Sequence, residues 1–164
     1  MATSHQNLSA INSEEVPNAA EMKIGIVVSE WNTQITNGLL KGAKETLIKF
    51  GLKEQSLFIE SVPGSFELAL GAKWLLEAHQ LDAVICLGCV IQGETRHFDF
   101  VCHGITQGIV QLSQDTGKPV IFGVLTDNNL QQSIDRSGGK HGNKGDEAAV
   151  TAIKMVALRK KLIS

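Results

Sequence analysis

Short apolar runs alternate with helical patterns along most of this 164-residue chain, and this alternation limits the fold more than any other feature. Runs rich in valine, isoleucine and leucine predict four strands, at residues 23–29, 56–62, 82–88 and 119–125. Apolar residues at three- and four-residue steps predict helices after them, at residues 36–50, 65–79, 98–112, 128–136 and 146–162. Because the strands are continuously apolar, we expect an α/β fold with a four-stranded parallel sheet covered by helices on both faces.

The composition fits one domain with a single core, and it argues against several classes of protein. Hydrophobic residues make up 43% of the chain, and the net charge of −2 is unlike the basic balance of a nucleic-acid binder. The chain lacks both a secretory pattern at its start and an apolar run of about 18 residues, so we expect neither secretion nor membrane insertion. An odd number of cysteines favours free thiols and a cytoplasmic protein.

Residues 1–21 differ from the rest of the chain because they are polar and mixed, with Pro17 near their end. We predict that they form a mobile N-terminal arm and that the folded domain spans residues 22–164. Such an arm is either simply disordered or adds to a neighbouring subunit, and the sequence leaves both interpretations open.

Ligand sites in parallel α/β sheets form beyond the carboxyl ends of the strands, which directs the search to four loops. These are residues 30–35, 62–67, 89–97 and 126–129. In the first loop, Trp31 offers either a stacking wall for a flat heterocycle or a hydrophobic lid over the sheet edge. In the second, Ser65 is expected to cap the next helix and Glu67 to complement its dipole, while the neighbouring amides are available to a polar ligand.

The third loop is the richest in chemistry. Gly93 and Thr95 lie just before a helix N-terminus, where backbone N–H groups can bind a phosphate, and Arg96 adds positive charge. His97 is the group in this loop best suited to titrate near neutral pH. The alternative is that His97 is only an exposed residue at a helix start.

Two further patterns have competing interpretations. The glycine-rich segment at residues 136–145 carries three cations, so it is either an anion site in which Arg136 binds phosphate or a solvated hinge between helices. It lacks the residue order of a P-loop, which disfavours nucleoside triphosphate binding. Cys86 and Cys89 have CxxC spacing, but the sequence has no second such pair, so we expect a structural role and no metal site.

Four ordered blocks resemble the lumazine synthase family: VPGSFEL, GCVIQGETRHFDFVC, PVIFGVLTDNNLQQSIDRSG and KHGNKGDEAA. The resemblance covers residues 23–162 and leaves the arm outside it. It implies a flavodoxin-like, three-layer α/β/α sandwich with its active site between neighbouring subunits. It also implies a cofactor-independent transferase of riboflavin biosynthesis. Such an enzyme condenses 5-amino-6-(D-ribitylamino)uracil with 3,4-dihydroxy-2-butanone 4-phosphate to give 6,7-dimethyl-8-ribityllumazine, phosphate and water.

The resemblance further implies roles for the matching residues. Trp31 stands where an aromatic ring, phenylalanine in many family members, stacks on the pyrimidine. The region that holds the ribityl chain corresponds to Asn32, Ser65, Phe66 and Glu67. The strand end whose backbone reads the pyrimidine edge corresponds to Cys89, Val90 and Ile91. The phosphate loop corresponds to Gly93, Glu94 and Thr95, and the proton-transfer residue to His97. The contribution of the adjacent subunit corresponds to Phe122, Arg136, which would bind the phosphate, and Lys144.

The family builds rings of five subunits, and some members close these homopentamers into an icosahedral shell. The short link at residues 136–145 favours the shell, whereas a partnership with riboflavin synthase is left open by the sequence. Two alternatives compete with an active lumazine synthase. One is a flavin-binding flavodoxin-like protein, which would purify yellow, and the other is a shell protein that has lost its activity.

Overall fold

The computed structural model describes residues 7–163 and contains the expected parallel sheet. Its strands are β1 (Ile24–Ser29), β2 (Leu57–Val62), β3 (Ala83–Ile91) and β4 (Val120–Asp127), which pair in the order β2-β1-β3-β4. All three pairings are parallel. This order is that of doubly wound, flavodoxin-like sheets, in which the chain reverses direction across the sheet between β1 and β3. The predicted α/β fold and its four-stranded parallel sheet are therefore confirmed.

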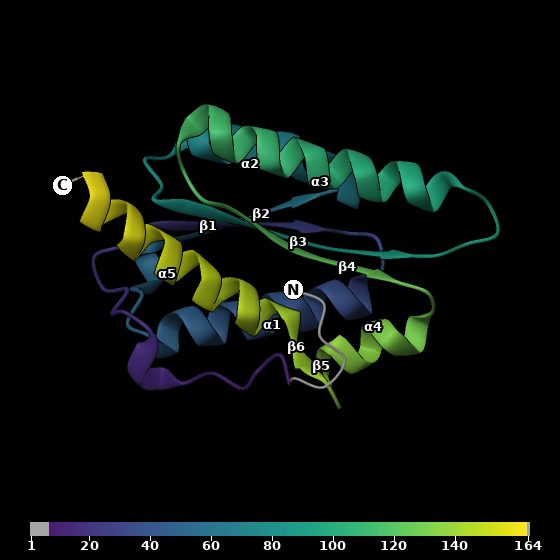
Figure 1. Cartoon of the computed structure of the whole chain (residues 1–164), viewed down its shortest axis with the longest axis horizontal. Helices are drawn as coiled ribbons and strands as arrows, with labels where there is room; N and C mark the ends of the chain where they lie inside the picture. Colours follow the sequence, from purple (N-terminus) through teal and green to yellow (C-terminus); the bar gives the residue numbers. More distant parts are fainter. Residues whose placement is uncertain (1–6, 164) are drawn as a thin grey trace.

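Helices cover both faces of this sheet (Figure 1). The helices α1 (Thr33–Lys49) and α5 (Lys144–Ile163) lie on one face, and α2 (Leu68–Ala78) and α3 (His97–Thr116) lie on the other. A shorter helix, α4 (Leu130–Arg136), follows β4, and 3-10 turns occupy Ser13–Glu15, Glu54–Ser56 and Ser65–Glu67. Among the described residues, none of these helices has the length and apolar character needed to cross a membrane.

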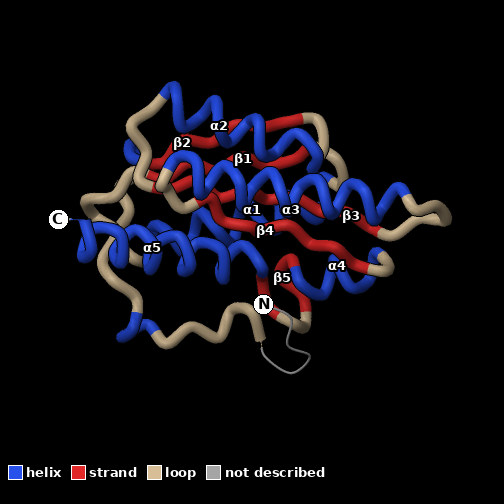
Figure 2. The backbone as a smooth tube through the Cα atoms, turned by 45° about the horizontal axis from the view of Figure 1, so that its top comes forward, coloured by secondary structure: helices blue, strands red, loops and turns tan. Residues whose placement is uncertain are grey.

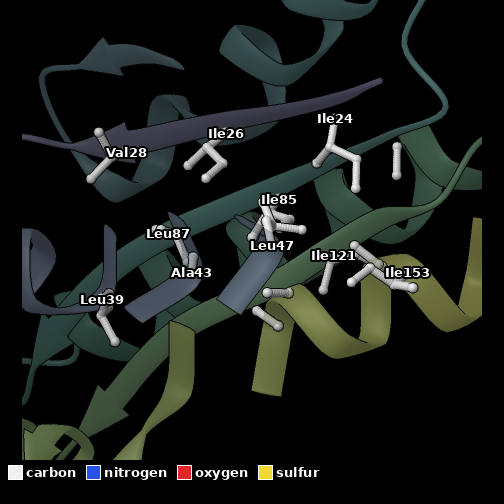
Figure 3. Close-up of a cluster of buried hydrophobic side chains, with 14 of the residues drawn as sticks. Ile24, Ile26, Val28, Leu39, Ala43, Leu47, Ile85, Leu87, Ile121 and Ile153 are labelled. Carbon is white, nitrogen blue, oxygen red and sulfur yellow. The ribbon is translucent and has the colours of Figure 1, made fainter. Parts of the chain in front are cut away.

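The sheet separates two hydrophobic clusters, one under each helical layer. Alternate residues of β1, namely Ile24, Ile26 and Val28, belong to the cluster shared with α1 and α5 (Figure 3), whereas Val27 belongs to the cluster shared with α2 and α3. Successive side chains of a strand point to opposite faces, so β1 is buried on both. This double burial explains why the strands read as continuously apolar runs.

The ends of the elements follow the expected signals in most places. Helix α1 ends at Lys49, and Gly51 follows with φ of 96°, a left-handed conformation that suits glycine and stops a helix. One expectation was wrong in part. Between the helices predicted at residues 128–136 and 146–162, β5 (Ser137–Gly139) and β6 (Gly142–Asn143) form an antiparallel hairpin that was not predicted, and α5 begins earlier than expected, at Lys144. Strands of two or three residues are too short to produce a periodic pattern.

The described part of the N-terminal arm, residues 7–21, packs along the folded body. Ala19 is fully buried and its N–H donates to the carbonyl of Phe50 at 2.8 Å. Glu15 pairs with Lys154 of α5 at 3.8 Å. The mobility of the arm stays a prediction, and residues 1–6 lie outside the described residues.

Leu47 gives a direct test of the helix–sheet core. Its side chain is fully buried under the sheet (Figure 3), so Leu47→Ala leaves a cavity and is expected to lower the free energy of unfolding by about 2–5 kcal/mol. Leu162→Ala is the matched control, because that leucine is 72% exposed. Urea unfolding followed by circular dichroism measures both, and equal losses would contradict this description of the core.

Candidate active site

Three loops meet past the carboxyl ends of β1, β2 and β3 and enclose a hollow of about 380 Å³. A volume of this size is enough for a small organic ligand. The predicted site residues that line it share this one edge of the sheet: Trp31, Asn32, Ser65, Phe66, Glu67, Cys89, Val90, Ile91 and His97. The structure therefore brings together the candidate residues of the first three loops.

The β1–α1 loop holds its tryptophan at the mouth of the hollow through a strained asparagine. Asn32 has φ of 59°, a left-handed conformation that asparagine tolerates better than most residues. Its side-chain amide donates to the carbonyl of Cys89 at 3.0 Å, and the N–H of Trp31 donates to the carbonyl of Pro63 at 3.3 Å. The loop is thus tied to the end of β3 and to the loop after β2, while the Trp31 ring stays 73% exposed and open to a stacking partner.

Ser65 does not cap a helix, contrary to expectation. Its residue begins a 3-10 turn ahead of α2, and neither turn nor helix has a side-chain cap within the described chain. The Ser65 hydroxyl is instead buried and lies 3.2 Å from the hydroxyl of Ser29 at the end of β1. A buried hydroxyl needs a hydrogen-bond partner. Ser29 supplies this partner, although it is distant in the sequence. Phe66 and Glu67 remain exposed at the rim.

The end of β3 forms the floor of the hollow and is held from beneath by a buried hydrogen-bond chain. The thiol of Cys89 donates to the Ser133 hydroxyl at 3.4 Å, which in turn donates to the Asp127 carboxylate at 2.8 Å. Burial raises the pKa of the Cys89 thiol, which keeps it protonated and able to donate. Ser133 and Asp127 support the site without lining it, and sequence analysis missed both. Their spacing of six residues across a strand end carries no recognisable signal.

The two cysteines of the CxxC sequence point away from each other. Cys86 lies in the cluster beneath α2 and α3, and Cys89 lies in the cluster on the opposite face of the sheet. Residues separated by an odd number along a strand face opposite sides, so these two sulfurs cannot share a metal ion or a disulfide. Burial raises the pKa of Cys86 to about 12.

The loop between β3 and α3 projects beyond the end of the sheet (Figure 1). On this loop, Gly93, Glu94 and Thr95 are exposed, and they do not belong to the lining of the hollow. His97 begins α3 and lines the hollow, and its backbone N–H donates to the Thr95 hydroxyl at 3.4 Å. Arg96 pairs with Asp99 at 3.6 Å on the outer surface. The predicted phosphate loop is therefore adjacent to the hollow and open to an anion.

The candidates assigned to an adjacent subunit lie elsewhere on the chain. Phe122 lines a second hollow, of about 730 Å³, between α3 and β4. Arg136 ends α4, where its guanidinium donates to the Gln132 carbonyl at 3.0 Å, and Lys144 pairs with Glu147 at 2.8 Å. Among the described residues, the lining of the first hollow includes none of Phe122, Arg136 and Lys144.

The lining also contains two residues that sequence analysis did not single out. Gly64 sits beside the Trp31 ring, where a Cβ would meet the Glu67 carboxylate at 2.8 Å. Val101 lies one helical turn after His97, and that spacing places the two side chains on the same face of α3. The four-residue step from His97 was a signal from which Val101 could have been found.

A 2-1-3-4 parallel sheet with a hollow past the ends of β1 and β3 defines a flavodoxin-like α/β protein whose candidate ligand site lies at the topological switch point of the sheet. The family model described as 6,7-dimethyl-8-ribityllumazine synthase matches residues 21–160. The chain belongs to this family.

Proteins of the same name are similar over nearly the whole chain. The relative from Flavobacterium johnsoniae is 59% identical over 98% of this chain and 85% of its own length. The relative from Parabacteroides distasonis is 60% identical over 95% of this chain and 98% of its own length. The relative from Cytophaga hutchinsonii is 55% identical over 96% of this chain and 98% of its own length.

Asn32 offers a test of how the aromatic loop is held. Asn32→Ala removes the hydrogen bond to Cys89 and puts a less tolerant residue at φ of 59°, so we expect a loss of about 1–3 kcal/mol in the free energy of unfolding. Asn32→Gly should lose less, because glycine adopts this conformation without strain. Urea unfolding compares them with Gln34→Ala, an exposed control in α1. If Asn32→Ala were as stable as the wild type, Asn32 would not hold the β1–α1 loop as we describe.

Proposed function

We propose that this protein is a lumazine synthase of riboflavin biosynthesis. Its substrates would be 5-amino-6-(D-ribitylamino)uracil and 3,4-dihydroxy-2-butanone 4-phosphate, and its products 6,7-dimethyl-8-ribityllumazine, phosphate and water. The observation that carries the proposal is the hollow in which Trp31, Glu67 and His97 meet at the switch point of a chain of this family.

The pyrimidine fits the part of the hollow between Trp31 and the end of β3. The exposed Trp31 ring provides a face for stacking on the heterocycle, and the backbone of Val90 and Ile91 provides hydrogen-bonding groups for its edge. Asn32, Ser65, Phe66 and Glu67 are assigned to the ribityl end. Of these, Glu67 offers an exposed carboxylate to hydroxyl groups, whereas Ser65 and Asn32 act by shaping the wall, because their polar groups already bond to Ser29 and Cys89.

The reaction is a series of proton transfers between two bound substrates. The pyrimidine amine attacks the ketone and water leaves as the imine forms. Elimination then releases phosphate, the resulting enol tautomerises, and the ribityl-bearing nitrogen closes the ring with loss of a second water. We assign proton transfer to His97, which stands at the mouth beside the phosphate loop. Orientation of the two reactants supplies much of the acceleration.

We infer that the site is completed by an adjacent copy of the chain. The three residues assigned to the neighbour, Phe122, Arg136 and Lys144, lie outside the lining of their own hollow, as a shared site requires. Gly93, Glu94 and Thr95 would then receive the phosphate opposite Arg136 of the next subunit. A ring of five such subunits is proposed, with closure into an icosahedral shell favoured by the short link between α4 and α5. The three free thiols agree with a cytoplasmic location.

Activity of His97→Ala tests the division of labour between orientation and proton transfer. We expect turnover to fall by no more than about 10²–10⁴-fold, because a positioned acid–base group contributes about that much while the substrates stay oriented. The assay follows lumazine absorbance after mixing both substrates, with the uncatalysed condensation subtracted. Gln114→Ala, an exposed change on the same helix, is the control. Complete loss of activity in a variant that still binds both substrates would contradict this division.

Arg136→Ala tests the phosphate assignment. We expect KM for the sugar phosphate to rise about 10- to 100-fold, as for the loss of a charge-assisted hydrogen bond, with a smaller change for the pyrimidine. Arg159→Ala removes an arginine from the far end of α5 and controls for overall charge. Equal effects of Arg136→Ala on both substrates would argue against a phosphate role.

A further inference from the structure

The hairpin of residues 137–143 joins two cations that the proposed function assigns to the neighbour's site, namely Arg136, which is placed on the phosphate, and Lys144. Arg136 is the last residue of α4 and Lys144 is the first of α5. Each is held on its own helix, Arg136 by the Gln132 carbonyl and Lys144 by Glu147. The hairpin is therefore the chain segment that links the two helix ends carrying these charges.

The tip of the hairpin is held to the end of α4, because the N–H of His141 donates to the Asp135 carbonyl at 2.8 Å and Lys140 pairs with the Asp135 carboxylate at 3.1 Å. The antiparallel ladder of the hairpin is short. It pairs Ser137 with Asn143 and Gly139 with Gly142, with an irregular register between them. Two strands of this length are marginal when isolated. From the inner side, the buried Asn143 fixes one strand, because its amide donates to the Gly38 carbonyl at 2.8 Å and its oxygen accepts from the Gly145 N–H at 2.8 Å.

The outer side of the hairpin is held by the N-terminal arm, which runs beneath α5 to reach it (Figure 2). The N–H of Leu8 donates to the His141 carbonyl at 2.8 Å, and the Ser9 hydroxyl accepts from the N–H of Asn143 at 2.9 Å. These bonds link residues more than 130 positions apart in the sequence.

The shape of the hairpin is matched to the arm at Gly142. This residue has φ of 83°, and a Cβ on it would lie 2.6 Å from the backbone nitrogen of Ser9. The arm is turned at this point by Asn7, whose side-chain oxygen accepts from the Ser9 N–H at 2.8 Å. Only glycine combines this backbone conformation with so close an approach.

The arm is in turn fastened along the body, so it can transmit a constraint to the hairpin. Glu15 pairs with Lys154 of α5 at 3.8 Å, and Glu21 pairs with Lys53 at 2.9 Å. Ala19 is buried and anchored to Phe50. The segment that holds the hairpin is therefore the end of an arm that is bound to the folded body at several points.

We propose that the N-terminal arm positions Arg136, the phosphate-binding cation of the proposed function, and that Ser9 is the positioning residue of the arm. The inference rests on the proposed function of Arg136. Ser9 acts through the hairpin and touches no substrate. Its effect is therefore expected in the binding of the sugar phosphate, while the pyrimidine hollow on β1 and β3 is left as it is.

The test measures both KM values, kcat and competitive inhibition by inorganic phosphate in four full-length variants. Ser9→Ala should raise KM for the sugar phosphate and the inhibition constant for phosphate about two- to tenfold, as for the loss of a hydrogen bond, with KM for the pyrimidine unchanged. Ser9→Thr should leave both constants at their wild-type values, because threonine keeps the hydroxyl. Gly142→Ala, which forces the arm and hairpin apart, should have the larger effect. Ser13→Ala, an exposed change in the same arm, should match the wild type.

The outcomes separate this inference from the proposed function. If the wild-type protein produces no lumazine above background, the proposed function fails. If the wild type is active and Ser9→Ala and Gly142→Ala leave phosphate inhibition unchanged, the arm does not position Arg136. Equal changes in both KM values, or loss of the assembly in light scattering together with them, would likewise overturn the inference and assign the arm a purely structural role.

Discussion

The parallel pairing of β1 with both β2 and β3 is the constraint on which the rest of this structure depends. Parallel neighbours must be joined by long crossovers, and the helices that make these crossovers bury both faces of the central strands. The same pairing brings three carboxyl ends to one edge of the sheet, so three loops distant in sequence become neighbours. The hollow between Trp31, Ser65 and Cys89 is a direct product of that geometry.

Hydrogen bonds hold those neighbouring loops in place and give the hollow a defined shape. The side chain of Asn32 bonds to the end of β3, and the hydroxyl of Ser65 bonds to the end of β1, so each loop is fixed by an element that it does not belong to. Beneath them, a hydrogen-bond chain from Cys89 through Ser133 to Asp127 joins the floor of the hollow to α4 and to the end of β4. Apolar and neutral groups dominate this site, and the cations assigned to it come from a different part of the chain. This separation suits an enzyme that binds both an uncharged heterocycle and a phosphate.

The sequence was informative where a property repeats along the chain and uninformative where it depends on a single distant contact. Strands and long helices were predicted because each needs many apolar residues at a regular spacing, as in β1 and α3. The first three loops of the site were predicted because strand ends determine where sites form. The capping role of Ser65 was wrong because its partner Ser29 is 36 residues away, and the hairpin after Arg136 has no apolar period to reveal it. The roles proposed for Phe122, Arg136 and Lys144 would require a second copy of the chain, so no pattern within one chain reveals them.

The opposed cysteines of β3 have a consequence for how this protein meets oxidants. Thiolates, not thiols, react with peroxide, and a thiol with a pKa of about 12 is ionised in roughly one molecule in 10⁵ at pH 7. Cys86 is therefore a poor nucleophile, and burial also raises the pKa of Cys89, which lowers the thiolate fraction of the thiol at the floor of the hollow. Since the pleat also keeps the two sulfurs on opposite faces, sulfenic acid at one position could not be resolved by the other. Because of this strand geometry, the CxxC sequence cannot carry out the disulfide chemistry for which that spacing is known.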